Sequence, residues 1–271
     1  MSIYSCKFAD TMKLKVGCKL EYFAKTNTPI ITLLRLRKDL SQFIESETFK
    51  IDPLIPTTEY VDLFGNYCQR MEVPQGPFIL DTTAVVVTTA EIEANIEANF
   101  TLIQNLPEQT LIYLLPSRYC ESDKLNAKAF EIINTQTLGY QMVEAIRKWI
   151  NINIKYEYNR SNSSTSALDT LESKHGVCRD LSHLAIALCR SINIPARIVV
   201  GYLYNLKPMD LHAWFEAYLD GQWYTFDATQ PVTMGGRVVL AYGRDAADVA
   251  TATYFGDMSL IRMNVFVEEI L

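Results

Sequence analysis

The sequence predicts an α+β protein with two parts: an N-terminal antiparallel β-sandwich-like domain in residues 1–120, and a domain of helices and antiparallel strands in residues 121–271. Three observations support this division. Before residue 120, apolar and polar residues alternate with a period of two, which is typical of half-buried strands. After residue 121, apolar residues recur at helical spacing. The last helical pattern is followed by a β-hairpin pattern, which is an α+β order.

Individual elements follow from the local patterns. The clearest strand is the first, where Leu14, Val16 and Cys18 alternate with lysine and glycine. The strands expected in the first half are residues 14–22, 31–37, 78–83 and 85–89. The helices expected in the second half are residues 122–133, 138–149 and 178–192. A mobile polar loop is expected at residues 159–166, and Ser166 with Asp169 is expected to start a short helical turn.

The composition narrows the partners and the compartment. A net charge of −6 gives the chain little to gain from counterion release on nucleic acid, so we exclude nucleic acid as the main partner. No apolar run approaches the roughly 20 residues that cross a bilayer, and residues 1–10 lack the apolar stretch of a signal peptide. The 6 cysteines form no CxxC pair, so we expect free thiols in a reducing cytoplasm and no metal knuckle.

Cys178 is the first candidate for chemistry. It opens the helix expected at residues 178–192, where unpaired backbone N–H groups and the positive end of the helix dipole favour a thiolate. Cys189 is on the same face about three turns further along, so we assign it to the core. A thiolate nucleophile needs a base, and the chain has 3 histidines. His183 is predicted to lie on a solvated helix face, and His175 in a turn.

The third histidine, His212, begins a strand that ends in the hairpin turn Asp220-Gly221. With a two-residue loop, the register makes His212 and Asp227 diagonal neighbours on one face, about 7–8 Å apart. A carboxylate at this position can orient an imidazole, as in catalytic triads. Alternatively, the two side chains only satisfy each other in a polar sheet face. We expect this polar face to meet the helix that begins at Cys178.

These segments resemble the transglutaminase-like superfamily of cysteine enzymes. Residues 176–180 (Gly-Val-Cys-Arg-Asp) are similar to the family's nucleophile segment. Its histidine and aspartate segments match residues 212–216 (His-Ala-Trp-Phe-Glu) and 227–229 (Asp-Ala-Thr). The family usually has proline where this chain has Ala228, so Asp227 is less restricted here. Looser similarity to the bacterial branch, which has an N-terminal β domain, is found at residues 62–66, 113–118 and 243–249.

The resemblance implies thiol acyl transfer. Cys178 would attack an amide carbonyl, His212 would transfer protons, and Asp227 would orient His212. The backbone N–H of Cys178 would supply one oxyanion donor. No metal or organic cofactor is implied. The further candidates for oxyanion or substrate contacts are Tyr156, Tyr158 and Trp214.

Three functions stay open at this point. The favoured one is hydrolysis of an amide or peptide bond in a peptide or protein substrate. The second is protein-glutamine transamidation, in which an amine takes the place of water at the thioester. The third is a binding scaffold without catalytic activity. Calcium-dependent cross-linking enzymes of the superfamily carry additional acidic loops and domains, for which 271 residues leave little room, so the length favours hydrolysis.

Overall fold

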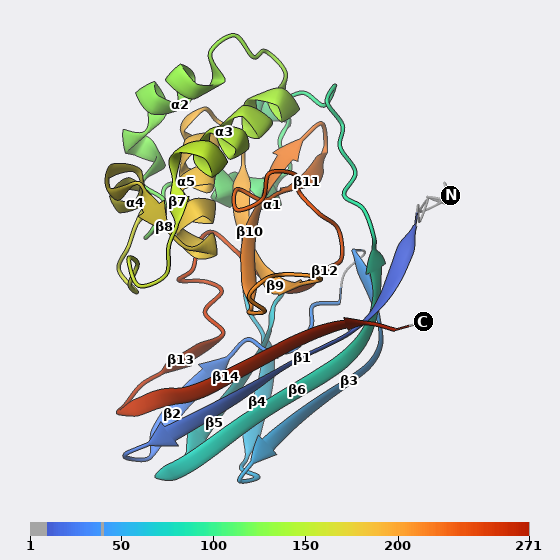
Figure 1. Ribbon diagram of the computed structural model, residues 1–271. Coiled ribbons are helices and arrows are strands. Elements are labelled where there is room, and N and C mark those ends of the chain that lie inside the picture. Colours follow the sequence, from blue (N-terminus) through green and yellow to red (C-terminus); the bar gives the residue numbers. More distant parts are fainter. Residues whose placement is uncertain (1–9, 39–40, 271) are drawn as a thin grey trace.

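The computed structural model describes residues 10–38 and 41–270. The segment in which we expect no signal peptide therefore lies outside the described residues, apart from Asp10, and so does Cys6. Figure 1 shows two stacked parts, with long strands in the lower part and a small sheet flanked by helices in the upper part. The mixture of antiparallel sheets and helices confirms the predicted α+β class.

The lower part contains two four-stranded sheets, ordered β14-β1-β6-β3 and β13-β2-β5-β4. The predicted first strand is confirmed, because its apolar residues from Leu14 to Tyr22 are all buried. They form one hydrophobic cluster with residues of the second sheet such as Ile30 and Met71. The strands are β1 (Thr11–Ala24), β2 (Thr28–Thr32), β3 (Gln42–Asp52), β4 (Thr57–Val61), β5 (Tyr67–Val73), β6 (Gly76–Thr89), β13 (Ala252–Tyr254) and β14 (Met258–Glu269).

Two strand predictions differ from the structure. The strand expected at residues 31–37 stops at Thr32, because the leucines that follow leave the sheet to fill two different cores. Leu33 packs with the helices of the upper part, whereas Leu34 and Leu36 pack inside the lower part. The strands expected at 78–83 and 85–89 are one continuous strand, β6.

The end of the chain returns to the lower part. The expected division at residue 120 placed β13 and β14 with the helices, but β14 pairs along the whole of β1 and β13 pairs with β2. β1 has buried residues along its length and needs a neighbour on each side, and β14 supplies the second one. Pairing between strands more than 230 residues apart leaves no local signal in the sequence.

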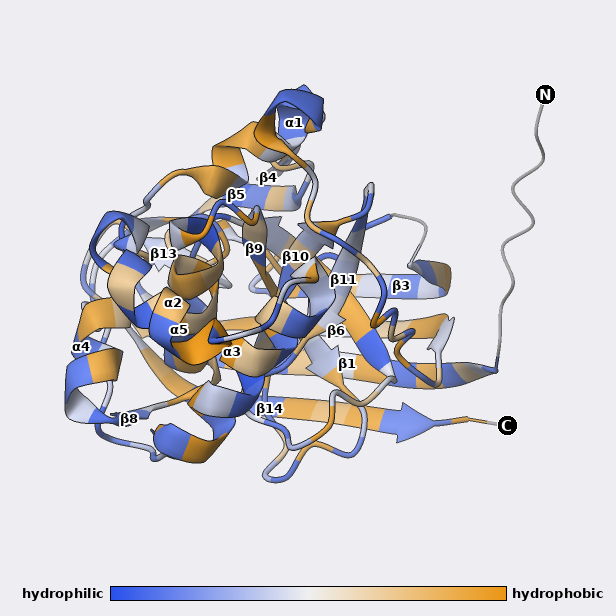
Figure 2. Cartoon of the chain, turned by 90° about the horizontal axis from the view of Figure 1, so that it is seen from above, coloured by the Kyte–Doolittle hydropathy of each residue, from blue (hydrophilic) through white to orange (hydrophobic). Residues whose placement is uncertain are grey.

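The upper part consists of helices packed on a four-stranded antiparallel sheet, ordered β11-β10-β9-β12. Figure 2, coloured by hydropathy, shows the apolar stretches of these helices beside one another. Ser166 and Asp169 form the expected capping box at the start of α4. The longer elements are α2 (Asn126–Ile133), α3 (Gly139–Asn153), α4 (Ala167–Ser173), α5 (Cys178–Ser191), β9 (Ala196–Leu203), β10 (His212–Leu219), β11 (Gln222–Phe226) and β12 (Arg237–Gly243). The short ones are α1 (Glu108–Leu111), β7 (Lys155–Tyr156) and β8 (His175–Gly176).

Helix α5 packs on the apolar face of the β10–β11 hairpin, not on the polar face as we predicted. Leu184 and Leu188 share one hydrophobic cluster with Phe215 and Phe226. Burying the apolar stripe of α5 against apolar side chains is the most favourable arrangement, so the helix packs on the apolar face of the hairpin. The opposite face, which carries Trp214, packs in a separate small cluster with residues of β9 and β12.

Two side-chain amides join the lower part to β12, the buried edge strand of the upper sheet. Gln42 donates to the carbonyl oxygen of Val239 at 2.9 Å and accepts from its N–H at 2.7 Å. Asn66 makes the same pair of bonds with Tyr242, at 2.8 and 2.9 Å. These amides bind backbone N–H and C=O groups of β12 in the way that a neighbouring strand would. They therefore link the two parts of the fold directly.

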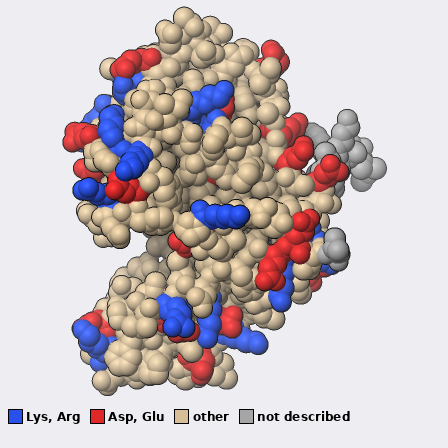
Figure 3. Space-filling model, viewed as in Figure 1, with Lys and Arg blue, Asp and Glu red and all other residues tan. Residues whose placement is uncertain are grey.

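Three properties bear on partners and environment. Among the described helices, none combines the length and apolar character needed to cross a membrane. In the described part of the chain, no three histidine, cysteine or acidic side chains are grouped as a metal site. On the face in Figure 3, basic and acidic side chains are interspersed and form no single basic patch.

Candidate active site

Cys178 is the first residue of α5 and is partly exposed. The helix begins there because the carboxylate of Asp180 turns back and accepts a hydrogen bond from the N–H of Val177 at 3.0 Å. Gly176 permits this close turn, since a Cβ at this position would lie 2.8 Å from the Asp180 side chain. Arg179 pairs with the fully buried Asp180 at 2.8 Å. These contacts hold the sulfur at the N-terminal end of the helix.

His212 and Asp227 lie together as the hairpin register predicted. Leu219 pairs with Gln222 across a two-residue turn, and the ladder ends at the pair of Phe215 with Phe226. Asp227 therefore leaves the strand and turns back toward the first residue of β10. Its Oδ2 lies 2.7 Å from Nε2 of His212, and both side chains are buried. The other ring nitrogen, Nδ1, is left for Cys178, which lines the same cavity as His212 and is near enough to raise the pKa of the ring.

The electrostatics of this group favour a charged imidazole. Burial by itself lowers the pKa of His212, but the Asp227 carboxylate opposes this through its charge and its hydrogen bond. The Cys178 side chain adds a smaller effect in the same direction, and the resulting pKa of His212 is about 9. Burial raises the pKa of Asp227, but the charges of Arg237 and His212 more than offset it, so the pKa lies well below its usual range.

Arg237 is the group that the sequence analysis missed. Its Nη2 donates to Oδ2 of Asp227 at 2.9 Å and to Oε1 of Gln230 at 3.0 Å. Its guanidinium also lies 4.9 Å from the ring centroid of Trp214. One oxygen of Asp227 thus faces both the imidazole and a buried guanidinium. An arginine that opens the otherwise apolar strand β12 was the available signal, but nothing local connects it to Asp227.

The loop that follows Asp227 is held from two sides. Thr229 donates from its N–H and its hydroxyl to Oδ1 of Asp227, at 2.9 and 2.7 Å. Arg147 of α3 is buried and donates to the carbonyl oxygens of Gln230 and Pro231. Every oxygen of the Asp227 carboxylate therefore accepts at least one hydrogen bond, and its orientation is restricted.

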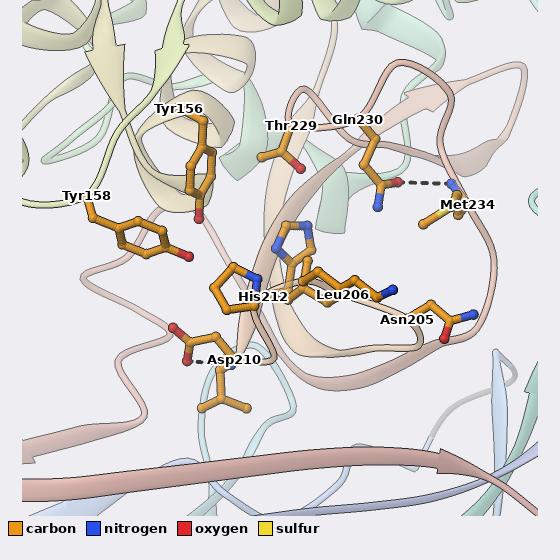
Figure 4. A pocket seen from close by; sticks show the side chains of 12 residues that line it. Tyr156, Tyr158, Asn205, Leu206, Asp210, His212, Thr229, Gln230 and Met234 are labelled. Carbon is orange, nitrogen blue, oxygen red and sulfur yellow. Dashed lines mark hydrogen bonds between the residues drawn. The ribbon is translucent and has the colours of Figure 1, made fainter.

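Tyr156 and Tyr158, the two tyrosines considered for oxyanion or substrate contacts, line one cavity together with His212. β7 runs parallel to β8, with Tyr156 opposite Gly176, two residues before the cysteine. Tyr156 packs edge-on against the ring of Tyr158, with centroids 5.4 Å apart, and the Cys178 backbone is near enough to its hydroxyl to affect its pKa. Figure 4 shows both hydroxyl groups directed into a cavity that His212 also lines. The volume of this cavity is about 260 Å³.

Trp214 has a different position from the one predicted. Its indole is only 1% exposed, so it cannot contact a substrate in this conformation. Its ring centroid lies 6.2 Å from that of His212, and Arg237 lies against the same ring. Because residues on one face of a strand alternate, the two-residue spacing puts Trp214 beneath His212. Trp214 supports the imidazole instead of lining the surface.

His183 is also not on a solvated face. It is fully buried, stacks on Tyr119 with centroids 5.1 Å apart, and accepts a hydrogen bond from the N–H of Ala246 at 3.0 Å. Burial lowers its pKa to about 3, so the ring is neutral. Helix α5 is covered on this side by the segment around Ala246, which the local sequence did not reveal. His175 contacts Ser173 and Glu157 and is not part of the group around Cys178.

The polar loop at residues 159–166, predicted to be mobile, is attached beside the cysteine. Arg179 donates to Ser161 Oγ at 3.0 Å and to the carbonyl oxygen of Asn162. The Tyr119 hydroxyl donates to the carbonyl oxygen of Ser163 at 2.7 Å. Three successive residues of the loop are thus bonded to groups that flank the nucleophile helix.

Comparisons with known proteins find similarity in both sequence and fold. A model of the transglutaminase-like superfamily matches residues 126–228, which contain Cys178, His212 and Asp227. The crystal structure of a candidate cysteine protease from Cytophaga hutchinsonii superposes with a TM-score of 0.91 and 37% identity, covering 97% of this chain and 92% of that chain. An uncharacterized protein of Mycobacterium leprae is 27% identical over 213 residues, or 72% of this chain and 76% of the relative.

Proposed function

The chain belongs to the transglutaminase-like superfamily, and on that basis we propose that it is a cysteine-dependent hydrolase of amide or peptide bonds in a peptide or protein substrate. One observation carries the proposal. Nε2 of His212 is bound to a buried, charged carboxylate, while the other ring nitrogen faces a partly exposed cysteine at a helix N-terminus. This is the arrangement of nucleophile, base and orienting group that thiol acyl transfer requires.

The first half of the reaction forms a thioester. Nδ1 of His212 holds the proton given up by the Cys178 thiol, so the imidazole is charged, and the thiolate sulfur attacks the carbonyl carbon of the substrate. The negative charge that develops on the carbonyl oxygen is stabilised by the Cys178 N–H and the Tyr156 hydroxyl. When the C–N bond breaks, His212 returns its proton to the leaving amine. The acyl group stays on the sulfur.

The second half releases the acyl group. His212, now neutral, takes a proton from water, and the hydroxide oxygen attacks the thioester carbonyl. Collapse of the intermediate breaks the C–S bond, gives a carboxylic acid and returns the proton to the thiolate. Asp227 keeps the imidazole oriented throughout and stabilises its charged form, since the carboxylate stays ionised.

The proposal is tested by the reactivity of the cysteines. We expect iodoacetamide to alkylate Cys178 faster than any other cysteine at neutral pH, measured by mass spectrometry between pH 5 and 9. Accessibility alone also favours Cys178, because the other described cysteines are buried. The informative comparison is His212→Ala, which leaves access open and should slow the reaction markedly at neutral pH. Equal rates in the two proteins would refute an activated thiol.

Hydrolysis and amine transfer share the thioester intermediate. They differ in whether water or an amine then attacks it. A mixture of peptidyl aminomethylcoumarin amides should release coumarin with wild type and not with Cys178→Ala. Mass spectrometry of the acyl product, with and without added primary amine, then separates the two reactions. We expect the free acid to dominate in both cases.

The free thiols of the described cysteines support our further proposal that the protein works in a reducing compartment.

Tyr156→Phe removes only the hydroxyl that we assign to the oxyanion. Loss of one such donor typically lowers kcat by about 10²–10³-fold, and we expect a reduction of that size with little change in KM. Tyr158→Phe is the matched control, because Tyr158 is similarly exposed and lines the same cavity. If both variants lose the same activity, the hydroxyl of Tyr156 has no special part in the reaction.

A further inference from the structure

A second cavity adjoins the reacting groups, and neither Tyr156 nor Tyr158 is among its lining residues. Its volume is about 360 Å³, and it is lined by both Cys178 and His212. The cavity that Tyr156 and Tyr158 line includes His212 but not Cys178. In the reaction proposed above, only the acyl part of the substrate remains bonded to the sulfur after the amine leaves. The cavity that contains the sulfur is therefore the one that can hold an acyl-side side chain in both half-reactions.

The walls of this cavity are mainly aliphatic. One wall comes from β9 and from the start of β10, and the other comes from the segment after β12. Its polar lining includes the hydroxyls of Ser163 and Thr251. Two further polar groups are already bonded: Tyr119 donates to Ser163, and Arg179 binds Asp180 and Asn162. The aliphatic residues that carry the argument are Ile198, Val200, Leu211, Val249 and Ala250.

We propose that this cavity binds an apolar side chain on the acyl side of the substrate, and that it sets the specificity of the reaction. The inference rests on the proposed hydrolase function and adds its substrate class. Burial of an apolar side chain against these walls is favourable, whereas a lysine side chain would lose hydration and meet the like charge of Arg179. The volume lies in the usual range of ligand pockets, roughly 300–1,000 Å³.

The lower part of the fold shapes this cavity. Thr251 lines it, and its carbonyl oxygen accepts a hydrogen bond from the N–H of Leu33 at 3.0 Å. Ala252 also lines it and is the first residue of β13, which pairs with β2. One wall of the cavity is thus attached to the β-sandwich, which positions that wall relative to the cysteine.

The two cavities differ in chemistry. The one lined by the tyrosines also contains Asp210, whose carboxylate accepts a hydrogen bond from the N–H of Leu211 at 2.7 Å and is drawn in Figure 4. Asn205, Lys207 and Gln230 add further polar groups to its lining. We therefore expect the cavity beside Cys178, and not the one lined by Tyr156 and Tyr158, to distinguish apolar from charged residues on the acyl side.

The test uses two pairs of acetyl-dipeptidyl chloromethyl ketones. The two probes of a pair differ only by leucine or lysine at one position, which is the first position in one pair and the second in the other. The rate constant for alkylation of Cys178 is measured by mass spectrometry and divided by the rate with iodoacetamide. At one position we expect the leucine probe to react about 10–200-fold faster than the lysine probe, as hydrophobic pockets discriminate. No variant is needed for this comparison.

Ala250→Glu places a carboxylate in the cavity wall, and Ala247→Glu places one on the same segment at an exposed position that does not line the cavity. The first variant should lower the leucine-to-lysine ratio at least tenfold, by slowing leucine and accelerating lysine. The second should keep the wild-type ratio, and melting temperatures and iodoacetamide rates should stay alike in all three proteins.

The proposal is overturned if leucine and lysine probes react equally, or if the two variants change the ratio equally. Selectivity without coumarin release would support the cavity and count against hydrolysis.

Discussion

Asp227→Asn should lower kcat about 10⁴-fold, the size of effect seen when the orienting carboxylate of a triad becomes an amide. Oδ2 of Asp227 accepts hydrogen bonds from both His212 and Arg237, and Oδ1 accepts two from Thr229. An asparagine has one oxygen and one NH₂ group in place of the two carboxylate oxygens. Its NH₂ group must therefore point either toward His212 and Arg237 or toward Thr229. Facing the imidazole, it favours the tautomer that carries the proton on Nδ1. That tautomer cannot take the proton of Cys178.

The same variant should change the dependence of activity on pH. In the wild type the pKa of His212 is raised to about 9, so the charged imidazole is kept up to that pH and lost above it. Its contribution to stability is fully present below the unfolded value of about 6.5 and disappears as the pH rises through about 9. Without the carboxylate charge the pKa of His212 falls. The alkaline limb of the kcat/KM profile should therefore move to lower pH.

The experiment compares kcat, the pH profile from 5 to 10 and the melting temperature of Asp227→Asn and Asp220→Asn. Asp220 lies in the exposed hairpin turn, and its substitution should leave all three quantities nearly unchanged. A moderate loss of melting temperature is compatible with the expectation for Asp227→Asn. A folded variant with the wild-type alkaline limb would show that Asp227 does not set the protonation of His212.

Arg237→Met should destabilise the protein by about 3 kcal/mol, in the range measured when one partner of a buried ion pair is removed. The carboxylate of Asp227 is fully buried and would keep only the imidazole as a cationic partner. Gln230 would lose a donor, and the carbonyl oxygen of Met234 would lose the hydrogen bond from Nε of Arg237. Methionine fills a similar volume, so the loss reports charge and hydrogen bonding more than packing.

Urea unfolding at pH 7 measures this loss, with Arg262→Met as the matched control. Arg262 lies on the exposed part of β14, and a surface substitution there should cost about 0.5 kcal/mol or less. Arg237→Met should also lower kcat, since the orientation of Asp227 depends on its partners. Equal midpoints for the two variants would contradict the assignment of Arg237 as the buried counter-ion.

Local patterns determined much of this protein. The alternation from Leu14 to Tyr22 predicted β1, and Ser166 with Asp169 predicted the start of α4, because both depend on residues that are close in sequence. The order of cysteine, histidine and aspartate, together with a two-residue turn, placed His212 beside Asp227. A hairpin register follows from the turn itself, which explains why a functional pair could be located without a structure.

Only the tertiary structure decided the contacts between distant segments. It showed which face of β10 covers α5, why Trp214 and His183 are buried, and that β14 completes the sheet of β1. It also brought Arg237 to Asp227 and placed the segment after β12 as a wall of the cavity beside Cys178. The periodicity of apolar residues indicates that a side chain is buried. It does not indicate in which of the hydrophobic cores the side chain lies. That choice depends on which apolar surfaces and buried charges are brought together when the whole chain packs.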